Sequence, residues 1–382
     1  MRTGLDRLLE RVPEELRGAR VALLSHAGAL SGDGAAAVDA LAAHPGLHLV
    51  RLLAAEHGLR GERPAGEAVA DGRDGPSGLP VVSLYGGAGA GAALRGCDAL
   101  LVDLQDIGCR YFTFPGSVRR LLGPAAAAGC PVWVLDRPNP LGGETAGPVA
   151  VPVAARSLVA AFSVPVRHGL TLGELALLAA REDGLPPGAV RVLGVEDWRR
   201  ADGFPAWGRP WIPPSPNSSG PEMAELYPGT ALVEGTNLSE GRGTPYPFRQ
   251  LGAPWVDGPL WARRAAPLLP VGLRVRPVWF VPTASKHAGA PCQGVALDLV
   301  PGVARAADAA LVSAVHLLSL AVEAGWVAFV AHGGGHWLDR LSGGPALREA
   351  LGRPAAVEEL LAGWRAEAAA FARDRPVDLY PA

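Results

Sequence analysis

Short apolar runs alternate with longer amphipathic segments through the first half of the chain. Four of these runs have the length and branching of buried strands, at residues 21–28, 47–58, 98–106 and 132–140. Segments with helical spacing lie at residues 34–44, 114–129 and 171–183. Strand, helix and strand in repeated succession predict an α/β fold, with a parallel sheet and helices on both of its faces.

The pattern changes near residue 206. Residues 204–223 (FPAWGRPWIPPSPNSSGPEM) are rich in proline and tryptophan, which is typical of a crossing between domains. Beyond them, strand-like runs at 230–237, 273–285 and 294–300 are followed by helix-like segments at about 306–325, 345–352 and 355–373. A chain of 382 residues is also longer than one core usually supports. We therefore predict two domains, residues 1–205 with the parallel sheet and residues 206–382 with a smaller α+β fold.

Polar side chains follow each of the four predicted strands of the first domain. The pairs are Ser25–His26, Glu56–His57, Gln105–Asp106 and Asp136–Arg137. In open α/β sheets, ligands bind just outside the carboxyl ends of the strands. The stretch AAEHGLRGERPAGEAV, residues 54–69, carries the most ionisable groups and therefore marks the expected edge of a binding site.

Composition narrows the class of partner. The formal net charge is −2 and 19% of the residues are charged, so the chain has neither the basic surface of a nucleic-acid binder nor an acidic tail. No signal-peptide core or run of 18 apolar residues occurs, and the four scattered cysteines are expected to be free thiols. We therefore predict a cytoplasmic protein that binds small molecules, with no nucleic-acid or membrane partner.

Residue usage is strongly biased. The chain has 34 arginines but one lysine, Lys286, and three asparagines, Asn139, Asn217 and Asn237. This bias is typical of GC-rich coding, which removes residues with AT-rich codons wherever another residue serves. All four survivors lie in turns, which indicates a function for them, although asparagine also favours turns for backbone reasons.

Two glycine-rich motifs favour loops rather than sites. GGAGAG, residues 86–91, lacks the strict GxGxxG spacing of a dinucleotide-binding turn. HGGGH, residues 332–336, is accompanied by neither a GxSxG elbow nor a carboxylate–histidine set with metal-ligand spacing.

Three glutamates have the setting that glycosidic cleavage requires. That reaction needs an acid to protonate the leaving oxygen, and a second carboxylate or a neighbouring group of the substrate. Glu56, Glu234 and Glu240 each follow an apolar run in a glycine-bounded turn. Their spacing alone fits ordinary ion pairs with Arg60 and Arg242 equally well.

A family resemblance separates these alternatives. The motifs that carry it are, in order, AAEHGLRGERPAGEAV, GLPVVSLYG, VDLQDIGCRYFTF, VLDRPNPLGG, VPVRHGLTLGELA, WIPPSPN, YPGTALVEGTNLSEGRGTPYPF, GAPW, FVPTASKHAG and CQGV. From about residue 20 onward the chain resembles the exo-β-N-acetylmuramidase family of the NamZ type, formerly a domain-of-unknown-function family. The resemblance implies a Rossmann-like first domain, a smaller domain closing a cleft, and release of N-acetylmuramic acid from the non-reducing end of peptidoglycan fragments without a cofactor or metal.

The resemblance also implies site residues. Glu56 corresponds to the leading candidate for the general acid, with Glu234 or Glu240 as second carboxylate. The implied substrate-binding positions are His57, Arg60, Tyr85, Asp106, Arg110, Asn139, His168, Asn217, Asn237, Arg242, Lys286 and His287. Arg110, Arg242 and Lys286 are candidates to bind the lactyl carboxylate, because a buried anion needs a charge-assisted partner.

The chain departs from the family pattern at two places. It has Ser25–His26 where relatives usually show Thr-Asn, and ETAGP, residues 144–148, where they show VEGP. Two other functions stay open at this stage. They are a non-catalytic muropeptide-binding protein and a nucleotide-dependent α/β enzyme.

Overall fold

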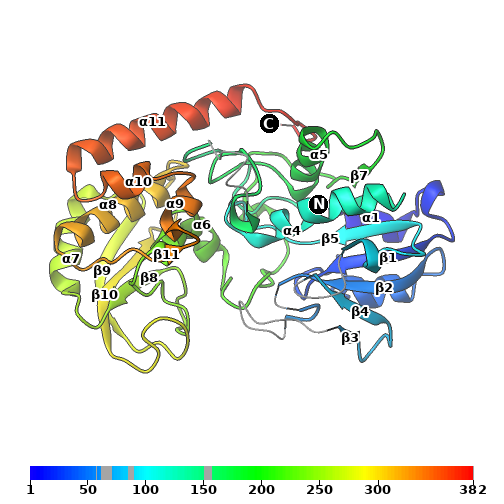
Figure 1. Ribbon diagram of the computed structural model, residues 1–382, viewed down its shortest axis with the longest axis horizontal. Coiled ribbons are helices and arrows are strands. Elements are labelled where there is room, and N and C mark those ends of the chain that lie inside the picture. Colours follow the sequence, from blue (N-terminus) through cyan, green and yellow to red (C-terminus); the bar gives the residue numbers. More distant parts are fainter. Residues whose placement is uncertain (57, 62–70, 85–89, 150–156, 382) are drawn as a thin grey trace.

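The computed structural model describes residues 1–56, 58–61, 71–84, 90–149 and 157–381. They form two lobes that lie side by side (Figure 1), a larger one with a seven-stranded sheet and a smaller one with a three-stranded sheet. The predicted fold class, a parallel-sheet α/β domain with a smaller α+β domain, is confirmed.

The large sheet has the order β3-β4-β2-β1-β5-β6-β7. Its parallel strands are β1 (Arg20–Ser25), β2 (His48–Ala54), β4 (Pro80–Ser83), β5 (Ala99–Asp103), β6 (Val132–Leu135) and β7 (Val190–Leu193), and β3 (Gly72–Arg73) is antiparallel at the edge. Every residue of β5 and β6 is buried, as expected for strands covered on both faces.

Helices cover both faces of this sheet, as predicted. The helices of the larger lobe are α1 (Gly4–Glu10), α2 (Ala37–Ala42), α3 (Ala90–Ala93), α4 (Thr113–Ala127) and α5 (Leu172–Glu182). Side chains alternate between two apolar cores, so that Leu23 packs with α1 and α2 while Leu24 packs with α4 and α5.

The smaller lobe is built from an antiparallel sheet and helices. Its sheet has the order β8-β10-β9, with β8 (Gln250–Ala253), β9 (Leu273–Phe280) and β10 (Cys292–Leu299). Its helices are α6 (Pro221–Thr230), α7 (Gly258–Ala265), α8 (Ala309–Glu323), α9 (Trp337–Ser342), α10 (Ala346–Ala350) and α11 (Pro354–Arg373). The HGGGH motif forms an exposed hairpin of β11 (Ala331–His332) and β12 (Gly335–His336), whereas residues 86–89 of GGAGAG lie outside the described residues.

One predicted strand is wrong. Residues 230–237 contain the end of α6 and a 3-10 helix, η5 (Ala231–Gly235). Ala231, Leu232 and Val233 are all fully buried, so the segment reads as a continuous apolar run. Such a run does not distinguish a strand from a buried helical turn.

The chain crosses between the lobes near residues 204–219 and returns after α11. Tyr380 donates a hydrogen bond to Asp136 Oδ2 at 2.5 Å, and Leu379 N donates to Glu174 Oε1 at 2.9 Å. Tyr380 packs with Trp198 and Met1, so both ends of the chain lie against the larger lobe (Figure 1). The predicted boundary after residue 205 falls in η4 (Phe204–Trp207). The predicted second domain, residues 206–382, also includes the C-terminal tail, whose Tyr380 contacts the larger lobe.

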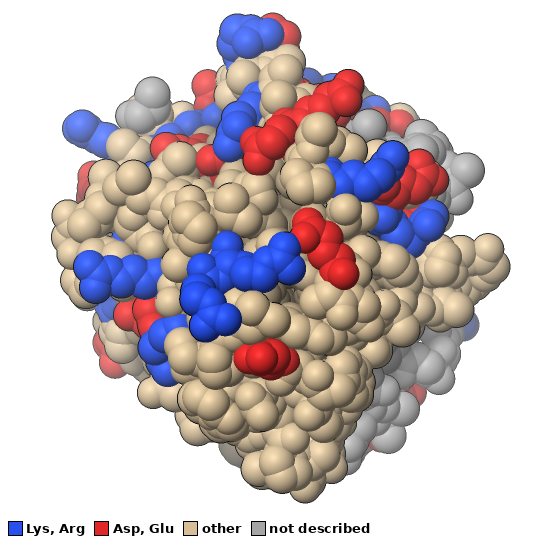
Figure 2. Space-filling view, turned by 90° about the vertical axis from the view of Figure 1, so that its left-hand side faces the viewer, with Lys and Arg blue, Asp and Glu red and all other residues tan. Residues whose placement is uncertain are grey.

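Charge is mixed on the outer end of the smaller lobe, where arginines and carboxylates lie next to one another (Figure 2). Arg276 pairs with Asp298 at 2.7 Å, and Arg264 pairs with Glu323 at 2.6 Å. Within the described parts of the chain, no helix has the length and apolarity needed to cross a membrane.

Candidate active site

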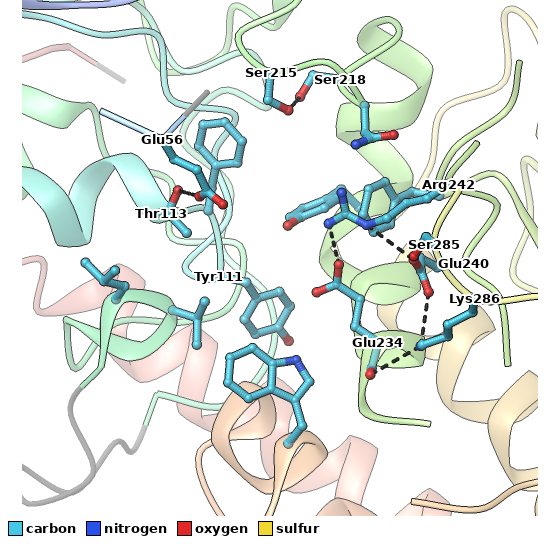
Figure 3. A pocket seen from close by; sticks show the side chains of 17 residues that line it. Glu56, Tyr111, Thr113, Ser215, Ser218, Glu234, Glu240, Arg242, Ser285 and Lys286 are labelled. Carbon is cyan, nitrogen blue, oxygen red and sulfur yellow. Dashed lines mark hydrogen bonds and ion pairs between the residues drawn. The ribbon is translucent and has the colours of Figure 1, made fainter. Parts of the chain in front are cut away.

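A pocket of about 460 Å³ lies between the lobes (Figure 3). The larger lobe contributes Glu56, Tyr111, Phe112, Thr113, Leu158 and Val159, and the crossing segment contributes Ser215, Asn217 and Ser218. The smaller lobe contributes Tyr227, Glu234, Glu240, Arg242, Phe248, Ser285, Lys286 and Trp337. The pocket therefore exists only where the two lobes meet.

Glu56 is positioned by the end of a strand and the start of a helix. It lies two residues beyond β2, and Gly58 has a φ of 81°, the left-handed conformation that lets the chain turn there. Thr113, the first residue of α4, donates a hydrogen bond from its hydroxyl to Glu56 Oε2 at 2.7 Å. Among the residues that the structure describes, no arginine or lysine forms an ion pair with Glu56.

The opposite wall holds two carboxylates and two cations (Figure 3). Arg242 Nη2 lies 2.6 Å from Glu234 Oε1, and Arg242 Nε lies 3.2 Å from Glu240 Oε1. Lys286 Nζ lies 3.1 Å from Glu240 Oε2. Burial raises the pKa of the Glu234 carboxyl, and the Arg242 guanidinium acts in the opposite direction.

Nη1 of Arg242 is available to a ligand. Its guanidinium carbon lies 4.9 Å from the centre of the Phe248 ring, which fixes the plane of the group. Nε and Nη2 contact the two glutamates, whereas Nη1 has no hydrogen-bond partner among the described residues. Because Arg242 lines the pocket, an anion that entered it would find this donor.

Lys286 holds the turn that carries the two glutamates. Its ammonium lies within 3.3 Å of the carbonyl oxygens of Val233 and Glu234 and 3.0 Å from that of Leu238. The flanking residues Ser285 and His287 have φ values of 67° and 60°, a conformation uncommon outside glycine. This backbone directs Lys286 inward, and His287 Nε2 contacts the Asn237 carbonyl oxygen at 2.8 Å.

Six of the predicted site residues line the pocket: Glu56, Asn217, Glu234, Glu240, Arg242 and Lys286. His57 and Tyr85 lie outside the described residues. The remaining seven positions do not line this pocket and form contacts within the protein.

Arg60 is one of these seven. Its guanidinium pairs with Asp74 through two hydrogen bonds of 2.7 and 2.9 Å and also contacts Asp39. These contacts tie the turn that follows Glu56 to the segment before β4.

A second group is buried in the larger lobe. Asp106 Oδ2 accepts a hydrogen bond from Gly108 N at 2.8 Å and lies 3.1 Å from His168 Nε2. Asn139 donates to the carbonyl oxygen of Leu170 and accepts from Leu141 N, both at 2.9 Å.

Arg110 and Asn237 likewise bind backbone groups. The Arg110 guanidinium donates to the carbonyl oxygens of Pro148, Val164 and Leu341, at 2.7 to 2.9 Å. Asn237 Oδ1 accepts from Ala328 N at 2.8 Å. Nη1 and Nη2 of Arg110 therefore bind loops and α9, whereas Nε has no hydrogen-bond partner among the described residues. Because Arg110 does not line the pocket, it is not one of the proposed anion-binding groups.

Sequence reasoning missed several pocket residues. Tyr111, Phe112 and Thr113 lie inside the motif VDLQDIGCRYFTF, in which the resemblance implies only Asp106 and Arg110 as site residues. Tyr227, Phe248 and Trp337 are aromatic residues that look like core in the sequence. The described residues contain no group of three or more His, Cys, Asp or Glu side chains arranged to hold a metal ion.

Comparison with known proteins agrees with this architecture. Residues 21–222 match the family model described as exo-beta-N-acetylmuramidase NamZ, N-terminal, and residues 225–380 match that of its C-terminal part. The chain is 37% identical over 300 residues to the peptidoglycan beta-N-acetylmuramidase NamZ of Bacillus subtilis (strain 168), which covers 78% of this chain and 72% of the relative.

Two crystal structures of Bacteroides fragilis proteins of the DUF1343 family are also similar. One superposes with a TM-score of 0.86 at 29% identity, covering 99% of this chain and 98% of the other. The second has a TM-score of 0.75 at 25% identity, covering 100% and 99% of the two chains. Together the two family models span the pocket-lining residues of both lobes. The chain therefore belongs to the NamZ family of exo-β-N-acetylmuramidases.

Proposed function

We propose that this protein is a glycosidase that releases N-acetylmuramic acid from the non-reducing end of peptidoglycan fragments. The observation that carries the proposal is the pocket between the lobes, where Glu56 faces a wall of two carboxylates and two cations (Figure 3). Its volume lies in the range of small-ligand pockets. Membership of the family supports the choice of muramic acid as the sugar.

Glu56 is the proposed general acid. Among the described residues its partner is the Thr113 hydroxyl and not a cation, so no ion pair with a described residue opposes its role as a proton donor. From this position it would protonate the glycosidic oxygen as the bond to the anomeric carbon breaks.

Glu234 is the proposed second carboxylate. Its side chain is 20% exposed, against 2% for that of Glu240, so Glu234 has the better access to a sugar. Glu240 bridges Arg242 and Lys286 and keeps both cations in place. The acetamido group of the substrate remains an alternative to Glu234 as the nucleophile.

The lactyl carboxylate is the group that distinguishes muramic acid from glucosamine. We assign it to Nη1 of Arg242, a pocket residue whose Nη1 has no hydrogen-bond partner among the described residues, with Lys286 nearby. A site that pairs a substrate anion rejects the analogue without it, because the site's charge is then left desolvated and unpaired. Asn217 and Ser215 of the crossing segment would bind sugar hydroxyls.

The test uses two chromogenic substrates, a β-N-acetylmuraminide and the matching β-N-acetylglucosaminide. We expect turnover of the first, with kcat/KM at least about 10²-fold below it for the second. Comparable rates on both would contradict the assignment of the lactyl group. Tight binding of N-acetylmuramic acid without any turnover would instead indicate a muropeptide-binding protein.

A further inference from the structure

One polar group in the pocket is buried and has no partner. The Tyr111 side chain is 2% exposed, and its hydroxyl forms no hydrogen bond with any described residue. Buried polar groups in proteins are almost always hydrogen-bonded, and an unpaired one costs about 1–3 kcal/mol. Tyr111 lines the pocket (Figure 3), so a ligand in the pocket can satisfy the hydroxyl.

The neighbour Arg110 fixes the position of Tyr111. Arg110 N donates to the carbonyl oxygen of Val166 at 2.9 Å, and its guanidinium binds the three carbonyls described above. The guanidinium carbon lies 5.9 Å from the centre of the Tyr111 ring. Because the Arg110 side chain is hydrogen-bonded to both lobes, the neighbouring Tyr111 is held in position at the wall of the pocket.

Leu158, Val159 and Trp337 line the pocket together with Tyr111. Leu158 and Val159 belong to η3 (Leu158–Ala160), which packs against α9, the helix that begins at Trp337 and accepts the Arg110 hydrogen bond at Leu341. We name Tyr111, Leu158, Val159 and Trp337 the Tyr111 corner; all four line the pocket. The pocket's cations, Arg242 and Lys286, come from the wall that carries Glu234 and Glu240.

We propose that the Tyr111 corner binds the 2-acetamido group of the sugar, with the Tyr111 hydroxyl donating a hydrogen bond to the acetamido carbonyl oxygen. The inference rests on the proposed function and adds to it a residue that determines specificity. A neutral amide with a methyl group requires one hydrogen-bonding partner and an apolar surface, which is what this corner offers. The lactyl anion requires a cation and therefore belongs to the opposite wall.

The test compares two sugars as competitive inhibitors of muraminide hydrolysis. N-acetylmuramic acid carries the acetamido group, and 3-O-lactylglucose carries a hydroxyl in its place. We expect the wild-type protein to prefer the first, and Tyr111→Phe to weaken that preference about tenfold, the equivalent of one hydrogen bond. The inhibition constant of 3-O-lactylglucose should hardly change.

Thermal stability provides a second measurement. Since the hydroxyl has no partner among the described residues, Tyr111→Phe should keep or raise the Tm, whereas loss of a structural hydrogen bond would lower it. Tyr246→Phe is the matched control, because Tyr246 is 47% exposed and does not line the pocket. It should change neither the Tm nor either inhibition constant.

Three results would overturn the inference. They are a wild-type protein that binds the two sugars equally well, a Tyr111→Phe variant that loses affinity for both to the same degree, and a Tyr111→Phe variant with a lowered Tm. A wild-type protein that hydrolyses the muraminide and discriminates between the sugars supports the proposed function whatever the variant does. A wild-type protein that binds neither sugar contradicts that function itself.

Discussion

At the scale of single residues, the three glutamates of the pocket differ in their partners. Glu56 accepts a hydrogen bond from a hydroxyl, whereas Glu234 and Glu240 share Arg242. A group that gives up and regains a proton in each turnover works best without a fixed cation, because a cation favours the ionised form. These partners are the reason why we assign the general acid to Glu56 and the second carboxylate to Glu234.

Glu56→Gln tests that division. Glutamine keeps an oxygen for the Thr113 hydroxyl but has no proton to deliver, so kcat should fall by roughly 10²–10⁴-fold with little change in Tm. The loss should be smaller on a chromogenic muraminide, whose leaving group needs less protonation, than on a natural disaccharide. Steady-state kinetics on both substrates measure the difference.

Glu323→Gln is the control, since Glu323 pairs with Arg264 on the surface of the smaller lobe. Equal losses on the two substrates in Glu56→Gln would show that Glu56 is not the acid. Glu234, whose pKa is raised by burial, would then take that role.

Motif resemblance identified six of the pocket residues but gave no means to separate them from the framework. Asp106 and Arg110 lie in the same motif as Tyr111, yet the Asp106 carboxylate contacts Gly108 and His168, and the Arg110 guanidinium binds backbone carbonyls of two loops and of α9. A sequence motif does not distinguish a residue that stabilises a loop from a residue that contacts a sugar. Only the direction of each side chain distinguishes them, and that direction depends on contacts between segments far apart in the chain.

At the scale of elements, alternation of apolar runs predicted β1, β2, β5 and β6, because buried parallel strands are short and apolar throughout. It did not predict β4 and β7, whose residues are mostly only partly buried. It failed at η5, where a helical turn is buried on all sides. The turn from η5 to Arg242 is also irregular, and its carbonyl groups are bound by Lys286 rather than by a strand. No local pattern encodes a partner about 50 residues away.

Lys286→Arg tests why the chain keeps its one lysine. A compact ammonium can donate to carbonyls in three directions, whereas the planar guanidinium of arginine cannot. We expect Lys286→Arg to lower the free energy of unfolding by about 2 kcal/mol and kcat/KM on the order of 10²-fold, because Glu234 is displaced. Thermal melts and muraminide kinetics check the two effects.

The reverse exchange Arg263→Lys, at an exposed position of α7, should leave both quantities unchanged. If Lys286→Arg behaves like the wild type, the position requires only a positive charge. The survival of lysine in this chain would then have no structural reason.

At the scale of the whole molecule, the returning tail closes over a buried carboxyl group. Asp136 is fully buried and accepts hydrogen bonds from Thr171, Gly173 and Tyr380. Burial raises the pKa of Asp136 to about 6, above its ordinary value of 3.8. The folded protein therefore binds a proton at Asp136 more tightly than the unfolded chain does. The contribution of the protonated Asp136 carboxyl group to stability is complete below about pH 4 and is lost as pH rises through about 6.

Asp136→Asn removes this titration. The stability difference, variant minus wild type, should become more positive between pH 4.5 and pH 8, by roughly 2–3 kcal/mol for a pKa shift of this size. Denaturant melts at several pH values measure it. Asp374→Asn, an exposed position after α11, is the control and should give a difference that does not depend on pH. A constant difference for Asp136→Asn would show that Asp136 is ionised in the folded protein throughout this range.

The return of the tail also limits how the lobes can move. A body attached by one flexible link can swing in any direction, but a body attached at two separate points can rotate only about the line that joins them. Here the two points are the crossing near residues 204–219 and the stretch between α11 and Tyr380. An opening of the pocket that kept both attachments would therefore be a rotation about this line, and it would have to break contacts between the lobes such as the hydrogen bond from Arg110 to the Leu341 carbonyl oxygen.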